Sequence, residues 1–497
     1  MCRRKLTLRR NPATLLSIGF IQVLIILVNI GRAKVLSMLL GPAGFGIVST
    51  IDQVVLSSVQ LGGFAIPFIA LKFLSHAHSE SHDRLAITFA SFFRGLLALS
   101  IITTLLLLGA IHLKPDLFGE DIVPYVEYLN LALLGAPSLM LGIFFVNTLA
   151  SAQQAAGSAR LNLLVTLALA IAACIGVWAG GIWGLYIATL LTGLGTTVVT
   201  MIYLSRGLNL GVLHSGAGIF RQLKQKPQIL TMAGALYLAM SAYTIAMLIV
   251  RFFIFSEYGE EEAGYYQALL SIALALGAIA GPMNSLFLTP ILNRDMAPRL
   301  KFEAAHDFQS NLSLILTAIA LPVILFPKLA LFTLFSSEFI SVFQVVFVFV
   351  FWQCFYQITN TYQQLLIGLD DVNFCTLSLV SGYSVAILAC YPLIQHFGLV
   401  GAALSLTLSN IITLLLINHR MKSRYGSPVP TVLWFKIAFC LGTIAAFGMA
   451  FTLLEEWTLT GIGTRSAVAV IYMVVLWQLL SADQKNQLLA LRSKLPF

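Results

Sequence analysis

Apart from Lys436 and Glu127, which lie near segment ends and are expected at the membrane surface, four basic side chains and one acidic side chain lie inside long apolar segments of this chain. Arg32 and Lys34 lie near the end of the first segment, and Asp52 lies in the second. Arg94 and Arg251 lie in two later segments. A charged group in hydrocarbon is costly and usually marks a binding site or a pathway. Because positive charges outnumber the negative one, an anion in the same space would offset the imbalance, and the planar fork of arginine suits phosphate.

Polar residues accompany two of these arginines at helical spacing. Gln22 and Asn29 share a helix face with Arg32, because residues seven and ten positions apart lie on the same side of a helix. A second polar stripe leads to Arg251 and contains Tyr237. Two such stripes predict two helices that face one cavity. The residues predicted to line this cavity and bind its guest are Arg32, Arg94, Arg251, Lys34, Gln22, Asn29, Ser241 and Thr244.

A simpler role is open to each charged residue. Arg32, Lys34 and Arg251 lie near the outer ends of their segments, where a long side chain can carry its charge to the membrane surface. Arg94 lies deeper, roughly 14 Å into its segment at about 1.5 Å per residue, so we expect it to face a cavity or an acid. Asp52 either pairs with Arg32 or Lys34 as a structural partner, or holds a proton or cation that drives transport.

No arrangement typical of catalysis or metal binding occurs in the sequence. His76, His78 and His82 match no zinc motif and are expected in a solvated loop. The six cysteines show neither metal-ligand spacing nor pairing outside the apolar segments, and they are expected to be small buried residues. We therefore predict no catalytic residue, no metal site and no cofactor.

The composition predicts an all-α, polytopic membrane protein. Hydrophobic residues make up 59% of the 497 residues and charged residues only 10%, whereas soluble domains carry about 25% charged residues. This excludes a soluble enzyme. A membrane-spanning helix needs about 20 mostly apolar residues, which predicts fourteen spans, with twelve as the alternative. The fourteen lie near 13–40, 44–73, 85–111, 123–149, 161–180, 182–204, 229–255, 264–292, 310–335, 340–367, 373–395, 398–418, 431–454 and 463–481.

Lysine and arginine are distributed unevenly between the predicted loops. With a cytoplasmic N-terminus, 21 of them fall in cytoplasmic segments and 3 in outer loops, namely Lys114, Lys328 and Arg465. The outer loops are instead acidic and include Glu455 and Glu456. Because cytoplasmic loops are enriched in basic residues, both termini are predicted to be cytoplasmic.

The two halves of the chain resemble each other at a nearly constant offset in the numbering. Gly46 corresponds to Gly264, and Gly181 corresponds to Gly398. The offset spans six predicted helices, an even number, so both copies enter the membrane in the same sense and form parallel lobes. We predict an N-terminal lobe over 1–208, a C-terminal lobe over 209–420, and two extra helices with a cytoplasmic tail over 421–497.

Two short segments resemble signatures of a known family. Residues 32–46, RAKVLSMLLGPAGFG, resemble the segment after the first helix of polysaccharide transporters, and residues 261–273, EEAGYYQALLSIA, resemble the segment that opens their eighth helix. These are the O-antigen and exopolysaccharide flippases of the multidrug/oligosaccharidyl-lipid/polysaccharide exporter superfamily.

The resemblance implies a V-shaped, alternating-access fold and a role in polysaccharide and lipopolysaccharide biosynthesis. The implied substrate is an undecaprenyl-diphosphate-linked oligosaccharide, moved from the cytoplasmic to the outer leaflet of the bacterial inner membrane. Arg32, Arg94 and Arg251 would correspond to the basic residues of the family's cavity. The implied partners are this lipid, the surrounding membrane lipids and other polysaccharide-assembly proteins, and not nucleic acid.

Other functions are compatible with parts of the sequence. The two extra helices also suit a flippase for peptidoglycan lipid precursors. A cation-coupled drug exporter would be expected to depend on cavity acids rather than on arginines. A membrane polysaccharide polymerase or ligase would be expected to carry a sizeable outer loop, and the sequence predicts none, so we do not expect an enzyme. A structural membrane scaffold is the remaining alternative.

Overall fold

The computed structural model describes residues 12–64, 66–152, 154–207, 227–284, 288, 292, 296–452 and 455–479. Almost all of these residues are helical and none lies in a strand, which confirms the predicted all-α class. The basic N-terminal tail, the basic loop within 208–226 and the C-terminal tail, on which much of the predicted orientation rests, lie outside the described residues. Helices pack into two compact units, Met1–Gly264 and Tyr265–Phe497.

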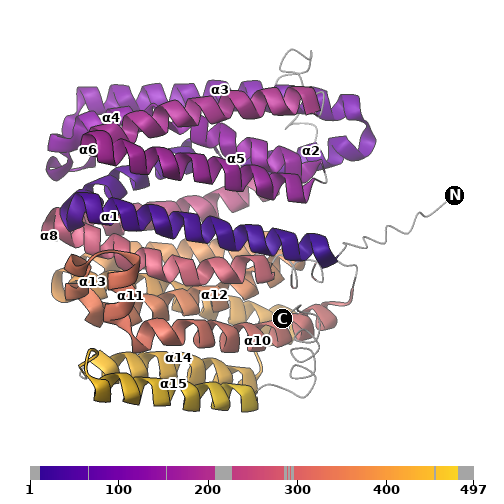
Figure 1. The fold of residues 1–497 in the computed structure, drawn as a ribbon. Helices are drawn as coiled ribbons and strands as arrows, with labels where there is room; N and C mark the ends of the chain where they lie inside the picture. Colours follow the sequence, from indigo (N-terminus) through magenta and orange to yellow (C-terminus); the bar gives the residue numbers. More distant parts are fainter. Residues whose placement is uncertain are drawn as a thin grey trace. The chain divides into compact units, whose positions relative to one another are not determined.

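Figure 1 shows the helices in chain order. The first unit contains α1 (Pro12–Gly62), α2 (Ile66–Glu80), α3 (His82–Leu113), η1 (Pro115–Phe118), η2 (Glu120–Tyr125), α4 (Val126–Leu133), α5 (Ala136–Ser151), α6 (Ala155–Gly207) and the first part of α8 (Pro227–Met283). The second unit contains the rest of α8 and α10 (Pro298–Leu325), α11 (Pro327–Leu334), η4 (Ser337–Val345), α12 (Val346–Gly368), α13 (Val372–Tyr425), α14 (Thr431–Thr452) and α15 (Leu459–Leu479).

The described helices are compatible in number with the fourteen predicted spans. Nine of them are long and apolar enough to cross a membrane, and the bent pair formed by η2–α4 and α5 brings the number to ten. Four of the ten, α1, α6, α8 and α13, are each two helices joined across a non-helical glycine. Counting each of these as two spans gives fourteen in the described part of the chain. This is a multi-pass membrane protein.

A glycine with positive φ marks each of the four breaks: Gly41 (66°), Gly181 (58°), Gly259 (83°) and Gly398 (54°). Glycine adopts this region without the steric cost that a Cβ would bring. At the offset found in the sequence, Gly259 corresponds to Gly41, and Gly398 corresponds to Gly181. The repeat therefore reverses the chain at equivalent points in both halves.

The turn between α5 and α6 recurs between α12 and α13. Gln154 donates its N–H to the carbonyl of Leu149, and its repeat equivalent Asp371 donates to that of Leu366. The side chains of Ser158 and Cys375 each donate to the carbonyl twelve positions earlier. Equal spacing of these contacts shows that the repeat is structural. The lobe boundaries at 208 and 420 follow from the repeat and stay a prediction.

Two repeat-related glycines allow their helices to cross at backbone contact. A Cβ on Gly46 would lie 1.9 Å from the carbonyl oxygen of Glu260, and a Cβ on Gly264 would lie 2.0 Å from that of Pro42. Glu260 corresponds to Pro42 at the same offset that relates the two glycines. The glycine of each segment thus contacts the equivalent carbonyl of the other segment, as in a two-fold interface.

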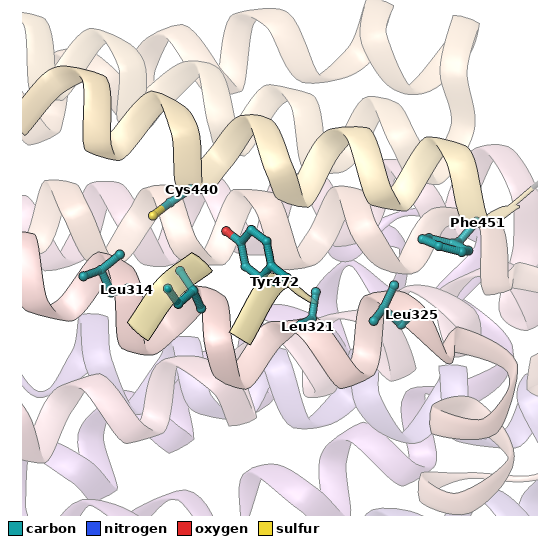
Figure 2. Close-up of a cluster of buried hydrophobic side chains, with 7 residues drawn as sticks. Leu314, Leu321, Leu325, Cys440, Phe451 and Tyr472 are labelled. Atoms are coloured by element: carbon teal, nitrogen blue, oxygen red, sulfur yellow. The ribbon is translucent and has the colours of Figure 1, made fainter. Parts of the chain in front are cut away.

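The outer helices α14 and α15 pack on α10. Figure 2 shows the apolar cluster that joins these three helices in the second unit. Its buried members are Leu314, Leu321 and Leu325 of α10, Cys440 and Phe451 of α14, and Tyr472 and Leu476 of α15. The last two predicted spans are therefore held to the bundle by a continuous apolar contact.

Arg465 does not lie in an outer loop, as the sequence predicted, but inside α15. Its side chain is 1% exposed and lies 3.8 Å from the carboxylate of Glu456, which is 2% exposed. Arg465 donates to the carbonyl of Leu325 at the end of α10. Glu456 accepts the N–H groups of Lys328 and Leu329 at the start of α11, at 3.0 and 2.8 Å. The prediction was wrong because these charges cap two helix ends, a use that loop counting cannot detect.

Candidate functional site

A cavity of about 500 Å³ lies within the first unit, among α1, α4, α5 and α6. Small residues face it where α4 meets α5 and on the second part of α6. They are Gly135, Ser138, Gly142 and Gly193. The two helices α4 and α5 are bent by 42° at their junction. Small side chains at a bend leave space that larger ones would fill, so this wall makes the cavity.

Arg32 and Asp52 form an ion pair at the wall of the cavity. The Nη2 of Arg32 lies 3.2 Å from Oδ2 of Asp52, and the two side chains are 31% and 43% exposed. Arg32 precedes the break at Gly41 by nine positions and Asp52 follows it by eleven. Because both parts of α1 are helical, these similar distances bring the two side chains to the same level.

Tyr186 completes this polar corner of the cavity. It is buried, and its hydroxyl lies 3.3 Å from Oδ1 of Asp52 and 3.2 Å from the carbonyl oxygen of Val48. The Nε of Arg32 is buried without a hydrogen-bond partner among the described residues. The corner therefore offers a carboxylate that can take up a proton, a hydroxyl, and a guanidinium whose donors are not all used.

Three of the predicted cavity residues lie where α8 packs on α1. Arg251 is 2% exposed, and its Nη1 donates to Oγ of Ser49 at 2.6 Å. Thr244 donates to the side chain of Gln60. Ser241 is half-buried on the same helix. These contacts join two helices of the first unit, and none of the three residues is among those that line the cavity within the described part of the chain.

The other predicted residues lie on helix surfaces. Arg94 is exposed on α3, and its Nε donates to the carbonyl of Ala90 at 3.2 Å. Lys34 and Gln22 are half-buried on α1, and Asn29 is exposed. The described cavity wall contains none of these four side chains. Of the predicted set, the structure brings together Arg32 and Asp52.

Several uncharged polar residues of the cavity wall escaped sequence reasoning. They are Asn147, Asn162, Thr166, Tyr186, Thr189, Thr196, Thr197 and Thr200. Such residues are common in membrane helices, so their types alone carry little signal. A usable signal was the run Gly135, Ser138, Gly142, whose spacing of three and four positions puts small side chains on one face.

Comparison with known proteins identifies the fold. No protein-family profile matches the sequence, and no curated protein matches it significantly. Solved structures do match. The lipid II flippase MurJ in an inward closed conformation has a TM-score of 0.69 and 14% identity, and the match covers 94% of this chain and 99% of that chain.

Two further matches are transporters of the MOP superfamily. A multidrug resistance MATE family transporter in its inward-facing conformation has a TM-score of 0.60 and 15% identity, over 88% of this chain and 98% of that chain. A transporter from Pyrococcus furiosus, described as having a binding pocket of reverse polarity, has a TM-score of 0.56 and 13% identity, over 87% and 96%. This chain therefore has the transporter fold that MurJ and the MATE proteins share.

Proposed function

We propose that this protein is a flippase for undecaprenyl-diphosphate-linked oligosaccharide, such as an O-antigen or exopolysaccharide repeat unit. It would move this lipid from the cytoplasmic to the outer leaflet of the bacterial inner membrane by alternating access, and it is not an enzyme. The observation that carries the proposal is the likeness in fold to a lipid II flippase over 94% of the chain. The resemblance of residues 32–46 and 261–273 to polysaccharide transporters supports the narrower substrate.

Arg32 is the residue that we propose for phosphate binding. It lines the cavity, and its guanidinium is held at 3.2 Å by Asp52. A diphosphate would compete with this carboxylate for the same donors, because both are anions that accept from arginine. Protonation of Asp52 would release Arg32 for the substrate. Exchange of a proton on Asp52 against phosphate on Arg32 would couple transport to a proton gradient.

The remaining predicted residues take other parts in this proposal. Arg251 is buried beside Ser49, so we assign it to the packing of α8 on α1. Arg94 is exposed on α3 and stays a candidate for a phosphate contact outside the cavity. Lys34, Gln22, Asn29, Ser241 and Thr244 stay candidates for the path of the substrate.

The test uses vesicles that contain only this protein and a synthetic undecaprenyl-diphosphate carrying a fluorescent oligosaccharide. We expect the protein to make the label of the inner leaflet accessible to an impermeant quencher. Arg32→Ala should abolish this movement, whereas Arg160→Ala, a change at an exposed arginine of α6, should leave it intact. Movement by Arg32→Ala at the wild-type rate would refute the phosphate site, and inactivity of the wild type on this lipid would refute the function.

A flippase for peptidoglycan precursors is the second candidate. The observation that favours it is the likeness in fold to MurJ, a lipid II flippase. The same vesicles with fluorescent lipid II decide between the two. The first function predicts faster movement of the oligosaccharide lipid, and the second predicts faster movement of lipid II. A cation-coupled drug exporter would instead accumulate a cationic dye and would lose this activity in Asp52→Asn rather than in Arg32→Ala.

A further inference from the structure

The second unit buries carboxamide side chains in its interior. Gln353 and Gln357 lie one turn apart on α12 and are 2% and 4% exposed, and Gln309 of the neighbouring α10 is 0% exposed. Burial of an aliphatic side chain would cost less free energy at such positions, because a buried amide must be hydrogen-bonded to offset the loss of water. These residues therefore need partners.

The described residues leave the amide oxygens of these three side chains without partners. The side-chain oxygens of Gln309, Gln353 and Gln357 are buried and have no hydrogen-bond partner in the part of the chain that the structure describes. The amide nitrogen of Gln309 does have one, the hydroxyl of Ser313 at 2.9 Å. Native proteins leave few buried polar atoms unsatisfied, and ordered water supplies many of the missing contacts.

Two of these side chains meet at one point on α8. A Cβ on Gly277 would lie 1.7 Å from Nε2 of Gln353 and 2.8 Å from Nε2 of Gln357. Glycine at this position thus leaves room for both carboxamides where α12 passes the second part of α8. The convergence makes a built polar site, and not a set of scattered exceptions.

We infer that ordered water molecules bind at Gly277, Gln353 and Gln357 and satisfy these carboxamides. Water suits the site because an amide presents both donors and acceptors, whereas a cation is bound by oxygens alone. The described acids that are buried in the second unit are Asp371 and Glu456, and each is already paired with arginine. A cation at this site would therefore lack a carboxylate.

Such water would act as a structural part of the second unit. It would join the two carboxamides of α12 by hydrogen bonds at the place where α12 passes Gly277 of α8, since a bridging water is nearly as favourable as a direct bond. This inference goes beyond the proposed transport function and does not depend on it.

The test compares Gln353→Met and Gln357→Met with the wild-type full-length protein by thermal unfolding in detergent. Methionine keeps the volume but cannot bond water, so we expect each variant to lose several degrees of melting temperature. Gln364→Met, a change at a half-buried glutamine of the same helix, is the matched control and should not shift it. An unchanged or raised melting temperature in the first two variants would mean that the amides were simply unsatisfied, which overturns the inference.

Two further measurements keep the inference testable if a variant fails to fold. A high-resolution experimental map of the wild type should show isolated density peaks within hydrogen-bond distance of the two carboxamides, and their absence would refute water binding. Melting in sodium chloride and in choline chloride should agree. A stabilisation by sodium that both variants lack would show that the guest is a cation, which also overturns the inference.

Discussion

The two halves of this chain, residues 12–207 and 227–425, share their turns and differ in their interiors. Both halves reverse at glycines with positive φ that lie at equivalent points of the repeat. Both also have the same backbone hydrogen bond in the turn before a long helix, donated by Gln154 before α6 and by Asp371 before α13. Turn geometry is fixed by backbone conformation, so it tolerates little change. The frame of the repeat is therefore common to both halves.

The interiors follow different chemistry. In the first unit α5 carries Ala136 and Met140, and at the equivalent positions of the second unit α12 carries Gln353 and Gln357. Both interiors contain packed aromatic rings, for example Phe89 and Phe144 at 5.4 Å in the first unit and Tyr266 and Phe349 at 5.7 Å in the second. The second unit adds the two buried amides of α12. One backbone frame thus supports apolar side chains at these positions in one half and carboxamides in the other.

The cavity also belongs to one half. Its wall contains Gly135, and the equivalent position in the second half is held by Trp352 of α12. Trp352 is 2% exposed and is among the largest buried side chains of the described chain. A large side chain in the place of a small one fills space that the first half leaves open.

The largest effect is expected at the crossing that the repeat shares. Gly46→Leu and Gly264→Leu each put side-chain atoms into a backbone carbonyl that lies about 2 Å from the new Cβ, and overpacking costs about 1–3 kcal/mol even where neighbours can yield. We expect little folded protein in size-exclusion profiles of detergent extracts. Gly31→Leu, where nothing lies within 4 Å, is the control. Wild-type yields of the first two variants would contradict a backbone crossing.

A large side chain in the cavity should fill space in the first half that is already filled in the second half. Ser138→Phe introduces the side chain found at the equivalent position of the second half, Phe355. Because Ser138 lines the cavity, we expect a loss of lipid movement of about tenfold or more, which corresponds to about 1.4 kcal/mol, with unchanged yield. The control is Ser205→Phe, a change at an exposed turn of α6. Full activity of Ser138→Phe would show that lipid movement does not need this cavity.

A buried carboxylate distinguishes the turns of the two halves. Asp371 is 6% exposed, accepts from Arg420 at 2.8 Å and forms an ion pair with Arg424 at 3.1 Å, whereas the first half has Gln154. Burial raises the pKa of Asp371, but the hydrogen bond and charge of Arg420, the charge of Arg424 and the hydrogen bond of Tyr425 outweigh it and hold the pKa below its usual 3.8. We expect Asp371→Asn to lower the melting temperature by several degrees at neutral pH, because two arginines lose their acceptor.

The pH dependence gives the sign of this contribution. A carboxyl whose pKa is lower in the folded protein stabilises it fully above the unfolded pKa, and the stabilisation is lost as the pH falls through the folded value. The difference between wild type and Asp371→Asn should therefore be constant at neutral pH and shrink below pH 3.8. Asp370→Asn, a change at the exposed neighbour, should show no such difference. A difference that grew on acidification would exclude the ion pairs as its source.

The smallest effect should be equal in the two halves. Gly181→Ala and Gly398→Ala meet no atom within 4 Å, so the cost of each arises from its backbone conformation alone, with φ of 58° and 54° and ψ of −141° and −131°, about 1–3 kcal/mol. For units of this size, that amounts to a few degrees of melting temperature. Gly109→Ala, in open space without positive φ, should match the wild type. Unequal shifts of the two variants would show that the shared frame is strained in one half only.

The fold followed from the sequence because its signals are local. A run of apolar residues spans a membrane wherever it occurs, and Gly41, Gly181 and Gly398 break the helices at positions that the predicted spans already separate. The repeat offset followed in part from the same glycines. None of these inferences required knowledge of which helices touch.

The site was less predictable because its residues are chosen by packing. Arg32 and Arg251 occupy similar places in their stripes, yet one lines a cavity with Asp52 and the other is buried beside Ser49. Arg465 was predicted to be a loop charge and instead lies inside α15, where it caps the end of α10, whereas Glu456 lies in the predicted loop and caps the start of α11. The sequence alone does not show whether a charged side chain will contact a carboxylate, a carbonyl or open space in the folded protein.

The sequence by itself determined that this chain crosses a membrane repeatedly, in two copies of one pattern, because hydropathy and glycine placement act over short stretches. Only the tertiary structure decided where space remains. The volume between helices depends on side chains from distant segments, such as Ser138 and Gly193 at the cavity of the first half and Trp352 in the core of the second. Such volumes are set by contacts between segments far apart in the chain, and a local pattern such as Gly135, Ser138 and Gly142 marks only one wall.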